Sequence, residues 1–238
     1  MNALASGLRW QAYGRGEPTT LVVHGLGATP GEARIPASGL PGTRIVVTLP
    51  SHGDAADAPA GYWTYRRIAD DLLEVARTVG ATRAIGVSLG AGALVSLLAA
   101  VPDAFERVAL LLPATLDHPR EFWSADGLVS AVELPADVQA GDYLAERAAA
   151  FKRLDAAVES LPGQVSVADP SVLAHVRAPV LVIAATGDPL HPAEVAKATA
   201  GAFPHGRLEV LPSRTPLVTH RREVRALLVG LVMGHGVV

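Results

Sequence analysis

Short apolar segments alternate with helix-like segments along most of the chain, and this alternation constrains the fold more than any other feature. Apolar runs of strand length lie at 20–24, 44–49, 83–87, 107–112, 179–185 and 207–211, and a strand pattern also covers 6–13. Helical patterns lie at 64–79, 89–101, 192–202 and 221–232. Strands that alternate with helices in this way form a mostly parallel β-sheet flanked by helices. We therefore expect an α/β fold with its ligand site at the carboxyl ends of the strands.

One uncharged stretch, 84–102, is long enough to raise the question of a membrane span. It begins with a strand-like run and continues through Gly86, Ser88, Gly90 and Gly92, which suit a tight turn better than an unbroken helix. We interpret it as strand, turn and buried helix, and expect no membrane span. The first ten residues lack a basic start followed by an apolar stretch, so no secretory signal is visible and a cytoplasmic location is expected.

Composition excludes several classes of site. The chain has 238 residues and no cysteine, which excludes a disulfide framework, thiolate metal sites and a cysteine nucleophile. The net charge of −3 provides no general attraction for nucleic acid. The arginines of 221–225 are interpreted as the solvent-facing side of the last helix. Neither a metal-binding spacing of histidines nor a glycine-rich phosphate loop is visible, so we predict no metal, no cofactor and no nucleic-acid partner.

The segment 117–178 interrupts the alternation. Its apolar residues recur at roughly helical intervals and predict two or three helices: Trp123, Leu128, Val132, Leu144, Phe151, Leu154 and Val158. A helical insertion after one strand of a parallel sheet lies naturally over the site. We interpret it as a cap, the alternative being helices that serve only to pack.

The sequence Gly86-Val87-Ser88-Leu89-Gly90 matches G-x-S-x-G. The pattern alone is weak, but here it lies between a predicted strand and a predicted helix, where a nucleophile elbow belongs. In such a turn the glycines let strand and helix approach closely, and the serine hydroxyl projects above the sheet. The alternative is an ordinary helix-entry turn with Ser88 as its cap. We predict that Ser88 is a nucleophile.

A second loop, His24-Gly25-Leu26-Gly27, follows the predicted strand 20–24. A loop in this place can direct backbone N–H groups toward a developing oxyanion. The Leu26 and Leu89 amides are the candidate pair, and the second lies at the start of a helix whose dipole favours negative charge. His24 and Gly25 are expected to organise the loop rather than transfer protons.

Together these motifs resemble the α/β-hydrolase fold superfamily, in its compact esterase-like branch. The similarity covers nearly all residues and includes the two loops above, Pro50–Asp54 and Thr186–Pro192. It implies a hydrolase core at 1–116 and 179–238, with the helical cap inserted at 117–178. It also implies a triad in the chain order serine, acid, histidine.

Asp188 follows the strand at 179–185, where the resembling family carries the acid that orients the histidine. The alternative for Asp188 is a structural role in the turn before Pro189. Asp117, which follows the strand at 107–112, is the reserve acid. His191 beside Asp188 is interpreted as a supporting or structural residue.

The catalytic histidine is expected after the last strand. His205 precedes that strand and His235 follows the last helix, which leaves His220 as the predicted base. The family more often has a Gly-His pair a few residues after the strand, a place held here by Thr215-Pro216. His220 therefore either reaches back to Ser88 or simply begins the last helix. His52 and Asp54, near the rim, are interpreted as turn residues.

These residues predict a serine hydrolase, of the carboxylic ester hydrolase kind, that cleaves an ester, thioester or related acyl bond through an acyl-enzyme. An apolar cap favours a small or medium apolar substrate. Two alternatives stay open. One is a related reaction on the same scaffold, such as carbon–carbon bond hydrolysis, perhydrolysis or a biosynthetic cyclisation. The other is a non-catalytic binding protein with a hydrolase fold.

Overall fold

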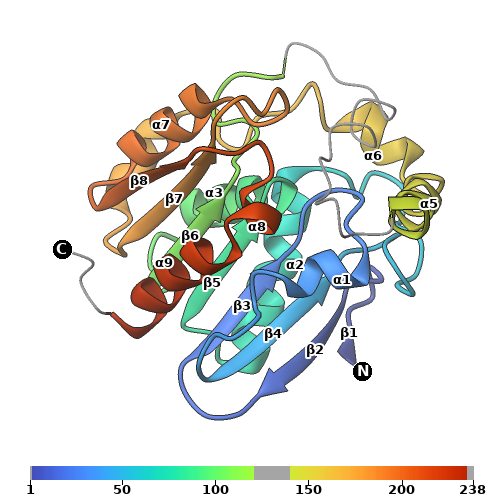
Figure 1. Cartoon of the computed structure of the whole chain (residues 1–238), viewed down its shortest axis with the longest axis horizontal. Helices are drawn as coiled ribbons and strands as arrows, with labels where there is room; N and C mark the ends of the chain where they lie inside the picture. The colour runs from blue at the N-terminus through green and yellow to red at the C-terminus, as the bar shows by residue number, and fades with distance from the viewer. Residues whose placement is uncertain (1, 121–139, 235–238) are drawn as a thin grey trace.

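A computed structural model of the chain describes residues 2–120 and 140–234. Its centre is one sheet in the order β1-β2-β4-β3-β5-β6-β7-β8 (Figure 1). The strands are β1 (Asn2–Ala3), β2 (Arg9–Gly14), β3 (Thr19–Val23), β4 (Thr43–Thr48), β5 (Arg83–Val87), β6 (Arg107–Leu111), β7 (Val180–Ala185) and β8 (Gly206–Leu211). From β4 to β8 every neighbouring pair is parallel, whereas β1 and β2 pair antiparallel at one edge.

Helices cover both faces of this sheet. The helices of the described residues are α1 (Pro30–Arg34), α2 (Tyr65–Val79), α3 (Leu89–Ala100), α5 (Ala140–Phe151), α6 (Asp155–Ser160), α7 (Ala193–Ala202), α8 (Pro216–Thr219) and α9 (Arg221–Met233), with a 3₁₀ helix at Pro170–His175. Successive strand residues alternate between the two cores: Leu21 and Val23 pack with α2 and α3, and Val22 packs with α1 and α9. The expected fold class, a mostly parallel sheet flanked by helices, is confirmed.

The uncharged stretch 84–102 forms most of β5 and the whole of α3. β5 is the central parallel strand between β3 and β6, and α3 is buried along nearly its entire length. High apolar content is what a strand and a helix in the middle of such a fold require. In the ranges that the structure describes, no helix combines the length and apolar character that a membrane crossing needs.

The sequence located the main strands and helices to within a few residues, and it missed the short elements. α2 begins at the N-cap Thr64, whose side chain accepts a hydrogen bond from the Arg67 N–H, and it ends at Gly80 with a left-handed φ of 65°. Three elements of five residues or fewer, β1, α1 and α8, were not anticipated. They are too short to show a hydrophobic period.

The segment between β6 and β7 contains α5, α6 and the 3₁₀ helix. Residues 121–139, with Trp123, Leu128 and Val132, lie outside the described residues. In Figure 1, α5 and α6 lie beyond one end of the sheet, near the loops that follow the strands. Phe151 and Leu154 are buried in the same core as α2 and α3.

Candidate active site

Ser88 lies on the sharp turn from β5 into α3. Its backbone has φ 51° and ψ −107°, a region that L-residues rarely adopt. The turn is held on both sides, because the Ser88 N–H donates to the Leu111 carbonyl at 2.9 Å and the Ser88 carbonyl accepts from the Gly92 N–H at 3.0 Å. A strained serine fixed in this way is the local geometry expected of a nucleophile elbow.

The two glycines of the motif are required by close packing. A Cβ on Gly86 would lie 2.5 Å from the Gly90 carbonyl oxygen, so β5 could not turn so tightly into α3. A Cβ on Gly90 would lie 2.5 Å from the Val23 oxygen and 2.9 Å from the His24 oxygen. The glycines therefore bring α3 against the end of β3, next to the loop that begins at His24.

Substitution of Gly90 by alanine should separate α3 from β3. We expect the free energy of unfolding to fall by about 1–3 kcal/mol, the usual cost of inserting a methyl group into a packed site. Urea denaturation measures this. Gly201→Ala in α7 is the matched control, because a Cβ there meets nothing within 4 Å and alanine is the better helix former. Equal stability of the Gly90→Ala variant and the wild type would contradict the packing explanation.

His191 lies between Ser88 and Asp188 and contacts both side chains. The Ser88 Oγ lies 2.8 Å from His191 Nε2, and the His191 Nδ1 lies 2.6 Å from Asp188 Oδ2. The other carboxylate oxygen of Asp188 accepts the Leu190 N–H at 2.8 Å. Since a carboxylate only accepts, Nδ1 carries the proton, and Nε2 is left free to accept the serine hydroxyl proton.

Asp188 and His191 both lie in the loop from β7 to α7. Their side chains are 9% and 13% exposed, so the pair is largely shielded from water. Burial raises the pKa of Asp188, but the hydrogen bond and charge of His191, with the loop N–H groups, outweigh it and hold this pKa below its ordinary value. The carboxylate stays ionised at neutral pH and can stabilise a positive charge on His191.

The prediction of His220 as the histidine facing Ser88 is corrected by these contacts. His220 lies at the junction of α8 and α9, where its Nδ1 is 2.8 Å from Thr219 Oγ1 and its Nε2 is 3.9 Å from Glu223 Oε2. The loop after β8 is occupied by the short helix α8, which turns His220 toward its own neighbours. The interpretation of His191 as merely supporting is corrected with it. His235 lies outside the described residues.

The reserve acid, Asp117, is not brought to this site. Its Oδ1 lies 2.9 Å from Nδ1 of the adjacent His118, whose side chain is 87% exposed. Asp188 therefore provides the carboxylate next to the histidine. One signal in the sequence could have pointed to His191: it is separated from Asp188 by a Pro-Leu turn that brings two side chains three positions apart together.

The loop His24–Gly27 passes directly beside the serine. A Cβ on Gly25 would lie 3.2 Å from the Ser88 Cβ and 3.9 Å from its Oγ. Leu26 follows Gly25, and Leu89 is the first residue of α3, where an N–H has no acceptor within the helix. Within the described ranges, no hydrogen-bond acceptor is recorded for the Leu26 or the Leu89 N–H. Of the two predicted oxyanion donors, Leu89 is thus next to Ser88 in the chain, and Leu26 follows Gly25, which lies beside Ser88.

Two buried histidines support this loop from beneath. His24 Nε2 accepts the Leu49 N–H at 3.0 Å, and His52 Nε2 accepts the Gly27 N–H at 2.9 Å. Each Nδ1 then donates to a carbonyl, of Gly25 for His24 and of Pro50 for His52. Burial lowers the pKa of both rings, and that of His52 lies well below its ordinary value. Both are therefore neutral. The expected role of His24 in organising the loop agrees with these contacts, and His52 does more than shape its own turn.

Acid should destabilise the fold through this pair. The unfolded chain binds protons at both histidines below their ordinary pKa of about 6.5, whereas the folded chain does not until lower pH. The free energy of unfolding is therefore unaffected by the pair above pH 6.5. Below it, each histidine lowers the unfolding free energy by up to about 1.4 kcal/mol per pH unit. Urea titrations at pH 7.5, 6.5 and 5.5 measure this slope, and a flat profile over that range would contradict it.

The segment that contains α5 and α6 contacts the loops around the site. A Cβ on Gly27 would lie 2.4 Å from the Phe151 ring, so this ring rests on the loop beside Ser88. The Arg147 Nη1 donates to Glu32 Oε1, in α1, at 3.1 Å. Arg153 donates to the Asp57 carboxylate and to the carbonyls of Gly53 and Ala55. These contacts attach the described part of the segment to α1 and to the chain at 53–57.

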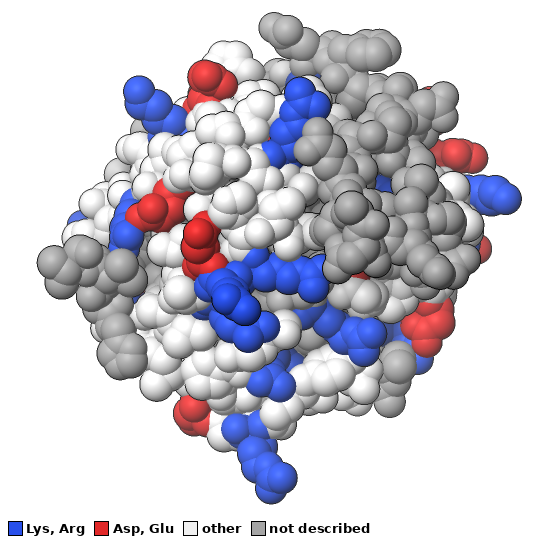
Figure 2. All heavy atoms as spheres, in the orientation of Figure 1, with Lys and Arg blue, Asp and Glu red and all other residues white. Residues whose placement is uncertain are grey.

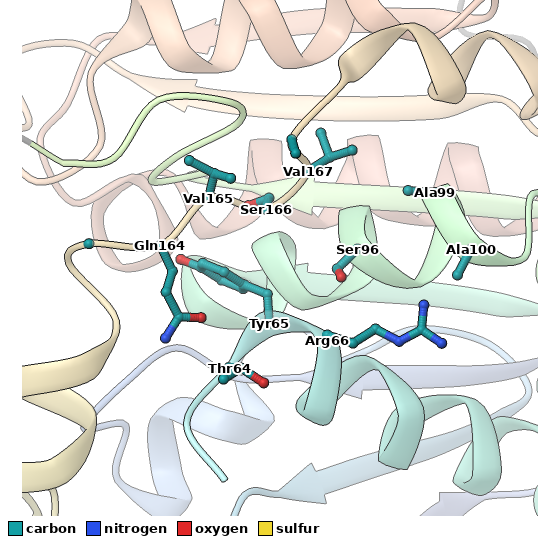
Figure 3. A pocket seen from close by; sticks show the side chains of 12 residues that line it. Thr64, Tyr65, Arg66, Ser96, Ala99, Ala100, Gln164, Val165, Ser166 and Val167 are labelled. Atoms are coloured by element: carbon teal, nitrogen blue, oxygen red, sulfur yellow. The ribbon is translucent and has the colours of Figure 1, made fainter. Parts of the chain in front are cut away.

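A separate groove of about 530 Å³ lies between α2, α3 and the chain at 163–168 (Figure 3). Tyr65 and Arg66 of α2, Ser96 of α3 and the chain at 163–168 line it, and the groove includes none of Ser88, Asp188 and His191. In the described residues, no group of three or more histidine and carboxylate side chains is placed to hold a metal ion.

The arginines of α9 are solvent-facing, as the sequence indicated. Arg221, Arg222 and Arg225 are exposed, while Val224 and Leu228 are buried against the sheet. Figure 2 shows basic side chains gathered near the centre of the face on which α9 and α1 lie. Arg225 reaches Ser38, in the chain that follows α1, at 3.4 Å.

Comparison with known proteins places the chain in a family. Residues 20–227 match the model of the Alpha/beta hydrolase family. Similar solved structures include an esterase from Exiguobacterium antarcticum (18% identity, TM-score 0.75, covering 95% of both chains). An enol-lactonase from Burkholderia xenovorans LB400 is 20% identical, with a TM-score of 0.74, and the match covers 95% of this chain and 96% of that one. A hydrolase from Pseudomonas aeruginosa PA01 is 23% identical, with a TM-score of 0.69, and the match covers 93% of this chain and 92% of that one. The search of curated proteins finds no match. At these identities the structures show the fold alone, whereas the family match spans most of the chain, and this protein is therefore a member of the alpha/beta hydrolase family.

Proposed function

We propose that the protein is a serine hydrolase that cleaves an ester, thioester or related acyl bond of a small or medium apolar substrate. The observation that carries this proposal is the unbroken hydrogen-bonded chain from Ser88 through His191 to Asp188. Family membership supports hydrolysis in general.

Ser88 is the proposed nucleophile and His191 the proposed base. Nε2 takes the hydroxyl proton as Oγ attacks the substrate carbonyl carbon, and Asp188 stabilises the imidazolium that results. The imidazolium then gives its proton to the departing alcohol or thiol, which leaves the acyl group on Ser88. Water attacks this acyl-enzyme while His191 accepts its proton. That proton returns to Ser88 Oγ as the carboxylic acid departs.

The Leu26 and Leu89 amides are the proposed oxyanion donors. During each attack the carbonyl oxygen gains negative charge, and two N–H groups directed at it stabilise the transition state more than the substrate. Removal of one such donor typically costs about 3 kcal/mol of barrier. The segment 117–178 is the proposed cap, because its described part rests on the loop that bears Leu26.

Two assays on the wild-type protein test this function. A fluorophosphonate probe should label Ser88, which mass spectrometry of the labelled peptide identifies. A series of p-nitrophenyl esters from acetate to octanoate should be hydrolysed, with turnover abolished by prior labelling. A folded protein that neither takes up the probe nor hydrolyses any ester would contradict the proposal. It would favour a binding protein with a hydrolase fold.

A further inference from the structure

His52 lies beneath the loop that follows β3, and no step of the proposed reaction uses it. Its side chain is completely buried and belongs to the turn after β4, far in sequence from Ser88. The Gly27 N–H donates to its Nε2 at 2.9 Å. This contact is adjacent in the chain to Leu26, a proposed oxyanion donor, so it can position that residue.

The tautomer of His52 is determined by its surroundings. Nδ1 lies 2.9 Å from the Pro50 carbonyl oxygen, which can only accept, so Nδ1 bears the proton. Nε2 is then a lone-pair acceptor for Gly27. Packing keeps the ring in place, because the rings of His24 and Trp63 lie at centroid distances of 4.6 Å and 6.0 Å. The charged groups that act on the pair are Arg153 on His52 and Glu32 on His24.

A second side chain, Phe151, also contacts this loop. Gly27 has a left-handed φ of 70°, and the Phe151 ring occupies the position that a Cβ would take. Gly27 thus has two partners: its N–H donates to His52, and the Phe151 ring packs where its Cβ would lie. The peptide group that carries the Gly27 N–H joins Leu26 to Gly27, so any rotation of that peptide disturbs the Leu26 backbone directly.

We propose that His52 is a positioning residue: its Nε2 holds the Gly27 amide and thereby directs the neighbouring Leu26 N–H toward the oxyanion formed at Ser88. This inference rests on the proposed function. Its effect belongs to the transition state, because the negative charge on the carbonyl oxygen develops only there. Loss of the acceptor should therefore lower kcat and leave KM almost unchanged.

Three variants of His52 separate the acceptor from the packing. In His52→Gln, the new Oε1 lies near the position of the histidine Nε2 and keeps an acceptor for the Gly27 N–H. In His52→Leu, the side chain has a volume similar to that of histidine but no acceptor. In His52→Asn, the side chain is polar but too short to reach Gly27. For p-nitrophenyl butyrate we expect His52→Leu and His52→Asn to lower kcat roughly 30- to 100-fold, part of the loss caused by deleting an oxyanion donor. His52→Gln should stay within about 5-fold of the wild type.

The affinity for phenylboronic acid provides a readout that a merely structural role would not move. Boronates add to the serine oxygen and form a tetrahedral adduct with an oxygen in the oxyanion position. We expect the dissociation constant of the boronate adduct to rise in His52→Leu and His52→Asn by about the same factor as kcat falls. In His52→Gln it should return to near the wild-type value. Ile68→Val in the core of α2 is the matched control, which lowers the melting temperature without changing kcat.

Each outcome decides the inference. The inference is overturned if kcat falls equally in His52→Gln and His52→Asn, or if kcat in His52→Asn stays within 3-fold of the wild type. It is also overturned if the substitutions raise KM and leave kcat unchanged. If the Leu variant fails to fold, the comparison of Asn with Gln still separates the two roles of the ring. A wild type that neither labels nor turns over would instead overturn the proposed function, whereas an active wild type with an unaffected Asn variant overturns this inference alone.

Discussion

Replacement of His191 by alanine is expected to lower kcat by about 10⁴- to 10⁶-fold, the loss seen when the base of a serine triad is removed. His191 is the histidine in contact with Ser88 Oγ, at 2.8 Å, and its other ring nitrogen is held by Asp188. Without His191 the hydroxyl proton loses the acceptor that this geometry provides as Oγ attacks. Stopped-flow or steady-state hydrolysis of p-nitrophenyl esters measures the change.

His220→Ala is the matched control for this experiment. It removes a second histidine, half-buried at the start of α9, that contacts Thr219 and Glu223 rather than the serine. We expect kcat to stay within about 3-fold of the wild type, as for a residue outside the reacting set. The reverse result, a large loss at His220 and none at His191, would assign the base to the loop after β8.

Substitution of Ser88 should separate activity from stability. Ser88→Ala and Ser88→Gly both remove the proposed nucleophile, and we expect a loss of kcat of about 10⁶-fold and no probe labelling in either. The backbone at Ser88 has φ 51° and ψ −107°, which glycine adopts far more readily than alanine. We therefore expect the Gly variant to be about 1 kcal/mol more stable than the Ala variant in urea denaturation.

This comparison isolates backbone strain, because both variants lack the hydroxyl and its contact with His191. An Ala variant as stable as the Gly variant would show that the turn stores no strain. Circular dichroism of both variants confirms that the fold is retained. The Gly variant is expected to be the more stable of the two because glycine adopts the strained backbone of this turn more readily.

The fold could be predicted from the sequence because its signals are local. Each buried strand is a short apolar run, and α2 has its cap residues and its apolar period within a single segment. The elbow could be predicted for the same reason, since the strand, both glycines, Ser88 and the following helix are contiguous. The serine, the acid and the two candidate oxyanion amides all lie at the carboxyl ends of strands, as the parallel sheet requires.

The support beneath the loop at 24–27 could not be predicted in the same way. His52 and Gly27 are 25 positions apart. They meet because β3 and β4 are parallel neighbours, so the loops that follow their carboxyl ends lie side by side. A lone histidine in a turn carries no pattern that names its partner. The contact of Phe151 with Gly27 is longer in range still, since it joins α5 to the loop after β3.

The sequence predicts the parallel sheet, Ser88 on its elbow and Asp188 after β7, because residues adjacent in the chain carry those features. It did not determine which histidine reaches the serine. His191 and His220 both follow the acid in the chain, so order alone allows either one. The packing of the loops places His191 at Ser88, because the Pro-Leu turn after Asp188 brings His191 back over Ser88, while α8 occupies the loop after β8 and holds His220 beside α9. Contacts between loops of different strands depend on three-dimensional packing, which no local pattern encodes.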